Sequence, residues 1–154
     1  MTKRMVLLVA LIWVPFLAIF GFASPAVTDA IGDSYPHMAF HVLAAVLLVS
    51  ALVLLVRLRR ETPDRLPRVL FGILTVTVSV AVLGNLVELV AAFSRFASDG
   101  WVSRRTEDLF GPHAGLHTLG ANLTIPALMA SMVLVLVSTG VTALKRRRNL
   151  ESVS

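Results

Sequence analysis

The chain contains four histidines, which form two pairs. His37 and His41 are four residues apart, and the second pair, His113 and His117, has the same spacing. In a helix this spacing places both rings of a pair on one face, with Cβ atoms about 5–6 Å apart. Neutral imidazoles held in this way can bind one cation, and they suit zinc or copper, whereas calcium and magnesium prefer oxygen ligands. We therefore predict one metal site that uses all four histidines.

The two pairs lie within longer segments that resemble each other. Residues 36–52 and 112–128 align without gaps at an offset of 76 residues, with eight identities in seventeen positions. Both histidines and the preceding proline coincide. Membrane proteins often contain parallel repeats of this kind, although two apolar helices also share Ala and Leu by chance, and the other apolar segments align poorly. We predict a 76-residue internal repeat whose unit is a helical hairpin.

Glu88 is the one carboxylate deep within an apolar segment. It follows Arg68 by twenty residues, which is about 30 Å along a helix, so we expect it near the level of His37. Asn85 lies on the same helical face, and the adjacent Gly84 permits close helix approach. Intramembrane acids usually serve a function, so we predict Glu88 as a further ligand, an acceptor for a histidine N–H or a proton carrier. The alternative is an interfacial carboxyl group, protonated or paired with a nearby arginine.

These residues must be positioned by membrane helices. The chain is 56% hydrophobic and 15% charged, against about 45–50% and 25% in ordinary soluble domains. This composition excludes a disordered chain, a coiled coil and a soluble enzyme of normal composition. A membrane span needs about 20 mostly apolar residues, and segments 5–23, 36–56, 69–93 and 115–144 qualify. We predict an all-α integral membrane protein, a four-transmembrane-helix bundle of two tandem hairpins in a single domain, 1–154.

Basic residues divide the connections into two groups. Eleven of the fourteen Lys and Arg residues lie at the N-terminus, between the second and third spans, and in the basic tail, residues 145–154. Because cytoplasmic loops are enriched in Lys and Arg, both termini are predicted to be cytoplasmic and the histidines extracytoplasmic. The basic residues cluster between the apolar segments, so membrane topology explains the net charge of +5. No nucleic-acid binding is therefore expected.

The first apolar segment has a second interpretation. Lys3 and Arg4 before an apolar stretch, with small residues near position 23, are typical of a cleavable signal peptide. The stretch is long for that purpose and contains Trp13 and Pro15, so we expect a retained helix. If residues 1–23 are cleaved, three spans remain and the new N-terminus is outside.

The depth of the histidines is predicted differently by two observations. His41 precedes Val56 by fifteen residues, whereas His117 precedes Leu144 by twenty-seven. Straight helices anchored at these ends would separate the two rings by about 18 Å. The repeat instead predicts the same depth for both. We favour the repeat, because a helix can extend freely beyond the membrane.

The predicted site indicates metal handling or redox chemistry, with zinc or copper as the ion. The first alternative is a haem b protein with His41 and His117 as axial ligands, which leaves the other pair unexplained. The second is a non-catalytic accessory subunit of a larger membrane complex, with histidines at headgroup level. The expected partners are the lipid bilayer and either another membrane protein or a second copy of the chain.

No enzyme class follows from the sequence. The absence of cysteine excludes disulfides, thiolate ligands and covalent c-type haem attachment. The chain also contains no Gly-rich phosphate loop, no HExxH motif and no serine nucleophile elbow.

Overall fold

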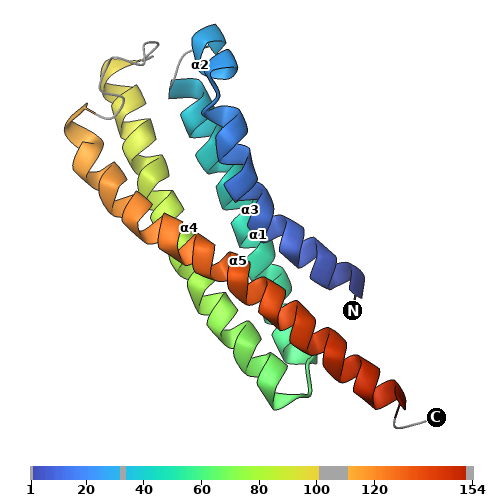
Figure 1. Ribbon diagram of the computed structural model, residues 1–154. Coiled ribbons are helices and arrows are strands. Elements are labelled where there is room, and N and C mark those ends of the chain that lie inside the picture. Colours follow the sequence, from blue (N-terminus) through green and yellow to red (C-terminus); the bar gives the residue numbers. More distant parts are fainter. Residues whose placement is uncertain (1, 32–33, 101–110, 152–154) are drawn as a thin grey trace.

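The computed structural model describes residues 2–31, 34–100 and 111–151. Its elements, in order, are α1 (Thr2–Phe22), α2 (Pro25–Ile31), α3 (Ser34–Glu61), α4 (Arg65–Asp99), the 3₁₀ turn η1 (Gly111–His113) and α5 (Ala114–Glu151). No strand occurs in these ranges, so the predicted all-helical class is confirmed (Figure 1).

Four of these helices, α1, α3, α4 and α5, are long and apolar enough to cross a membrane. In the most apolar window of each, at most 39% of the residues are buried inside the molecule. Large apolar side chains such as Val46, Val76 and Val133 point outward and are at least 60% exposed. An exterior of this kind matches the hydrocarbon of a bilayer, in which a helix satisfies its own backbone hydrogen bonds.

Several hydroxyl side chains inside the apolar helices donate to a carbonyl of their own helix. Ser50 donates to the carbonyl of Val46, and Thr139 donates to the carbonyl of Val135, each one turn earlier in the same helix. These bonds explain how polar residues are tolerated within segments of such high hydropathy.

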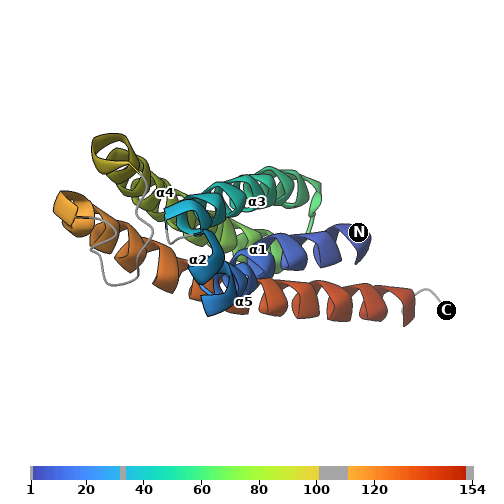
Figure 2. The ribbon, with the colours of Figure 1, turned by 90° about the horizontal axis from the view of Figure 1, so that it is seen from above.

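The helices that are consecutive in sequence pack against one another, and α1 also contacts α5. In contrast, no Cα atoms of α3 and α5 lie within 8 Å of each other among the described residues. Figure 2 shows α1 between α3 and α5 on one side of the bundle. The α3 and α5 helices are therefore diagonal, and only long side chains can join them. All four helices supply buried core residues, including Leu8, Ile12, Leu48, Leu55, Phe71 and Val135.

The helix boundaries differ from the predicted spans at several places, since α3 (Ser34–Glu61) and α4 (Arg65–Asp99) extend beyond the predicted 36–56 and 69–93. Between the first two predicted spans the structure has the short helix α2, which starts at Pro25. Proline suits this position because the first helical N–H has no partner in any case. The fourth helix is also longer than its predicted span, since α5 has 38 residues and is about 57 Å long. It crosses α4 at a clear angle (Figure 1).

Candidate metal centre

Two of the histidines stand on one face of α3. His37 and His41 lie in its first two turns, where a spacing of four residues brings the rings together as predicted. Their ring centroids are 4.6 Å apart, and the two Nε2 atoms are 2.9 Å apart. His41 is buried, with 1% of its surface exposed, and His37 is half-buried.

Asn85 of α4 fixes the orientation of the His41 ring. The Asn85 side-chain nitrogen donates to the backbone carbonyl of His41 at 2.9 Å, so its Oδ1 must face the ring, 2.8 Å from His41 Nδ1. An amide oxygen only accepts hydrogen bonds, so Nδ1 carries the proton and donates it. The His41 Nε2 atom therefore presents a lone pair to the cluster. A histidine held by its other ring nitrogen is the usual arrangement of a metal ligand.

The third histidine, His117, lies on α5, the helix diagonal to α3. His117 on α5 places its ring centroid 5.4 Å from that of His37 and 6.5 Å from that of His41. Each of these three residues offers one nitrogen, and the three atoms all lie within 4.8 Å of one another. Side chains thus bridge α3 and α5, whose backbones are not in contact.

Glu88 of α4 lies beside two of the three histidines, His41 and His117. Its Oε2 atom is 3.4 Å from Nε2 of His117 and 3.7 Å from Nε2 of His41. Its Oε1 atom accepts a hydrogen bond of 2.6 Å from the hydroxyl of Thr124 on α5. The Glu88 residue is only 6% exposed. The carboxylate is therefore held beside the histidines by a donor on the neighbouring helix, and is not directed to the surface.

Two glycines allow α4 and α5 to approach closely beside this carboxylate. A Cβ atom on Gly84 would lie 2.7 Å from the backbone nitrogen of Thr124. A Cβ atom on Gly120 would lie 2.5 Å from Cγ and 2.8 Å from the backbone nitrogen of Glu88. No larger residue fits at either position without moving the helices apart. The crossing point of α4 and α5 therefore sets the distance between Glu88 and His117, which lies one turn before Gly120.

The fourth histidine lies outside the cluster. His113 is the last residue of η1, and α5 begins at the next residue. The described residues that could hold one ion are His37, His41 and His117, and His113 is not among them. The structure brings together three of the four predicted histidine ligands, together with Glu88.

The depth separation expected from the basic anchors does not occur. His41 and His117 have ring centroids only 6.5 Å apart, against the 18 Å or so that straight helices would give. The reason is the length and tilt of α5, whose additional residues extend at its C-terminal end (Figure 1).

The geometry is compatible with a tetrahedral ion. Ligand atoms about 2.1 Å from such an ion lie about 3.4 Å from one another. The distances between ligand atoms in the cluster include 2.9, 3.4 and 3.7 Å. The three histidine nitrogens lie within 4.8 Å of one another, so side chains would have to move to bring every ligand atom to the spacing around a bound ion. Three imidazole nitrogens and one carboxylate oxygen form a donor set suited to zinc or copper.

Sequence analysis missed two residues of the site. The sequence does not single out Thr124, whose hydroxyl donates to Glu88. Gly120 was not singled out, although Gly120 and Thr124 have the four-residue spacing of small residues that mediates close helix packing in membranes. That spacing on α5 was the available signal, and its partner on α4 is Gly84.

The comparisons with known proteins add no assignment to this site. No model of a known family, no curated protein and no solved structure matches the chain significantly.

Proposed function

We propose that the chain is a multi-pass membrane protein that binds one zinc or copper ion through His37, His41 and His117. Glu88 serves as the fourth ligand or as the compensating charge. One observation carries this proposal, namely that nitrogens from two diagonal helices lie within 4.8 Å of one another. Histidines placed only for interfacial anchoring have no reason to meet in this way.

The surroundings of the cluster support a bound cation. Asn85 holds one ring of the site in the tautomer that a metal requires. A carboxylate beside neutral imidazoles offsets the charge of a dication, which matters most where the dielectric constant is low. The same carboxylate without a cation is a costly group in an apolar bundle.

The arrangement favours a compact ion over haem. Axial ligation by His41 and His117 requires an open slot as wide as the porphyrin between them. The ring of His37 lies 4.6 and 5.4 Å from the other two rings, and the Glu88 carboxylate approaches both axial candidates. These two side chains occupy the space that a macrocycle needs.

Partial exposure of the site supports exchange of the ion and hence metal handling. The side chain of His117 is 23% exposed, whereas that of His41 is 2% exposed. A metal can enter at the half-buried histidines and reach the buried one. The predicted orientation supports an entrance on the extracytoplasmic side.

Metal content of the purified protein tests the proposal. After extraction in mild detergent, elemental analysis should find close to one zinc or copper ion per chain. The variants His37→Gln and His117→Gln should lose it, because each removes one of three nitrogen ligands. The matched control is His113→Gln, which should retain the ion since its ring lies outside the cluster.

Three other outcomes would contradict the proposed metal site and favour a different function. Equal loss of metal in His113→Gln would restore the four-histidine site predicted from sequence and require η1 to rearrange. A Soret band in the purified protein would assign haem instead. Absence of metal, together with constant copurification of another membrane protein, would favour the accessory role.

A further inference from the structure

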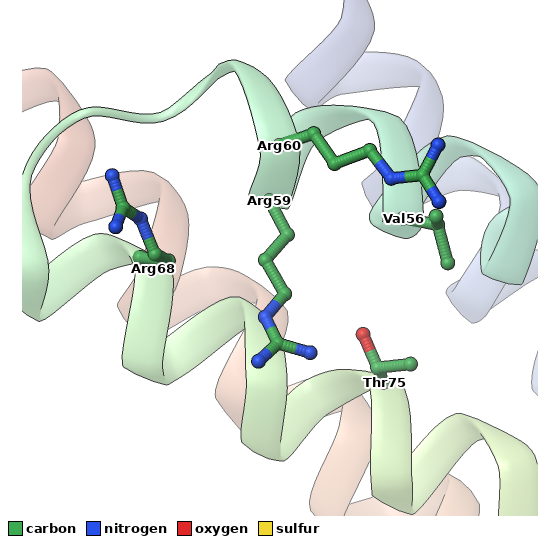
Figure 3. A pocket seen from close by; sticks show the side chains of 5 residues that line it. All are labelled: Val56, Arg59, Arg60, Arg68 and Thr75. Carbon is green, nitrogen blue, oxygen red and sulfur yellow. The ribbon is translucent and has the colours of Figure 1, made fainter.

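A basic pocket lies at the opposite end of the bundle from the histidines. It has a volume of about 520 Å³ and is lined by Val56, Arg59, Arg60, Arg68 and Thr75 (Figure 3). This volume is within the range of about 300–1,000 Å³ that is typical of ligand sites. Arg59 follows His37 by twenty-two residues of α3, which is about 33 Å. The pocket and the metal centre are therefore separate sites.

The arginines of this pocket are not neutralised by nearby acids. Glu61 pairs with Arg4 at 2.6 Å, and Asp64 pairs with Lys145 at 3.5 Å. Among the residues that the structure describes, no acidic side chain forms an ion pair with Arg59 or Arg60. Glu61 and Asp64, the acids closest in sequence, thus pair with basic side chains outside the pocket. The pocket therefore keeps its positive charge.

The connection between α3 and α4 gives the pocket a defined shape. Arg68 donates from Nε to the carbonyl of Thr62 and from Nη2 to the carbonyl of Pro63, both at 2.9 Å. Figure 3 shows Arg68 directed toward this connection and Arg59 extending from α3 across to α4, toward Thr75. The Arg59 guanidinium lies alongside Gly72 of α4, where an added Cβ atom would be 3.7 Å from its Cζ, an ordinary contact distance.

The chemistry of the lining residues fits a phosphate group. Guanidinium groups bind phosphate through paired N–H donors and hold it more specifically than an ammonium group does. Apolar surface continues from the pocket along both helices, since Val53 on α3 is 51% exposed and Val76 on α4 is 63% exposed. A ligand that combines a phosphate with hydrocarbon matches both parts. Basic pockets between membrane helices commonly bind anionic lipid headgroups.

We infer that this pocket binds an anionic phospholipid, with Arg59 and Arg60 as donors to its phosphate and its acyl chains along the exposed apolar faces of α3 and α4. The lipid would connect the two hairpins of the bundle at their basic end. This site is independent of the metal centre, and neither one requires the other.

Native mass spectrometry of the full chain in detergent tests this inference. Short-chain phosphatidylglycerol should remain bound at a concentration where phosphatidylcholine does not. The double variant Arg59→Gln/Arg60→Gln should weaken phosphatidylglycerol binding about tenfold or more. The double variant Arg147→Gln/Arg148→Gln changes the net charge equally at exposed positions of the tail, and should bind as the parent does. Circular dichroism of both variants checks that the helices are intact.

Three outcomes would overturn the inference. The first is equal weakening in the two double variants, which would show attraction by net charge alone. The second is equal retention of phosphatidylcholine and phosphatidylglycerol. The third is displacement of the lipid by inorganic phosphate or glycerol phosphate at concentrations similar to that of the lipid, which would make the pocket a site for a soluble anion.

Discussion

At the scale of single residues, His41 and Glu88 define what the site can bind. His41 is fixed by two hydrogen bonds to Asn85, so its free nitrogen points into the cluster before any ion arrives. Glu88 contributes the negative charge and is held by Thr124. An ion that binds here meets ligands that are already oriented, which reduces the entropic cost of binding.

The charge of Glu88 should distinguish divalent from monovalent ions. Glu88→Gln keeps the shape and the acceptor for Thr124 but removes the charge, so Zn²⁺ affinity should fall about tenfold or more. Cu⁺ affinity should fall less, because three neutral imidazoles suffice for a monovalent ion. Competition with chelators of known affinity measures both values. Glu151→Gln, at the exposed end of α5, serves as the control. Unchanged Zn²⁺ affinity in Glu88→Gln would remove this residue from the site.

At the scale of helices, the crossing of α4 and α5 determines the geometry of the site. Gly84 and Gly120 bring the two backbones together at the level of Glu88. Farther along the same interface, Ser131 donates to the hydroxyl of Thr77 at 2.8 Å, which adds a polar contact between the helices. Close packing and interhelical hydrogen bonds are the main forces between helices in lipid.

Substitution of the crossing glycine should therefore damage both stability and metal binding. Gly120→Ala places a methyl group 2.5 Å from Glu88 Cγ, so the helices must separate. We expect a loss of about 1–3 kcal/mol of stability, typical of overpacking, together with weaker metal binding. Thermal unfolding followed by circular dichroism gives the first value and chelator competition the second.

The same helix offers a matched control for this substitution. A Cβ atom on Gly140 would meet nothing within 4 Å. Gly140→Ala should leave metal binding unchanged and stabilise α5 slightly, because alanine has the higher helix propensity. Similar behaviour of the two variants would mean that the close contact at Gly120 does not constrain the site.

At the scale of the whole molecule, the two ends of the bundle differ in chemistry. One end holds the histidines and Glu88, and the other holds the arginine pocket and the basic C-terminal part of α5. Four helices cross between these ends, so the first and last helices bring both termini toward the same end (Figure 1). The excess of positive charge at that end predicts that it is cytoplasmic.

Cysteine labelling can test this orientation, because the chain contains no cysteine of its own. Ser98→Cys lies at the exposed end of α4 near the histidine side, and Glu151→Cys lies at the opposite end of α5. A membrane-impermeant maleimide should label the former in intact cells and the latter only after permeabilisation. The reverse pattern would invert the predicted topology, and labelling of both would contradict a spanning bundle.

Much of the candidate site could be predicted from the sequence because its signals are local. A four-residue spacing within a helix sets the separation of His37 and His41 regardless of the rest of the fold. An acid in an apolar segment must find a partner, which singled out Glu88. The internal repeat and the fate of residues 1–23 stay predictions.

Composition and periodicity determined that the chain forms four apolar helices, because the backbone of such segments has to satisfy its hydrogen bonds within each helix. Only the tertiary structure decided which side chains meet. The tilt of α5 cancels the depth difference between His41 and His117, and His113 lies outside the cluster. The tilt depends on packing between Gly84 and Gly120, thirty-six residues apart, and no local pattern encodes an angle set by such a distant contact.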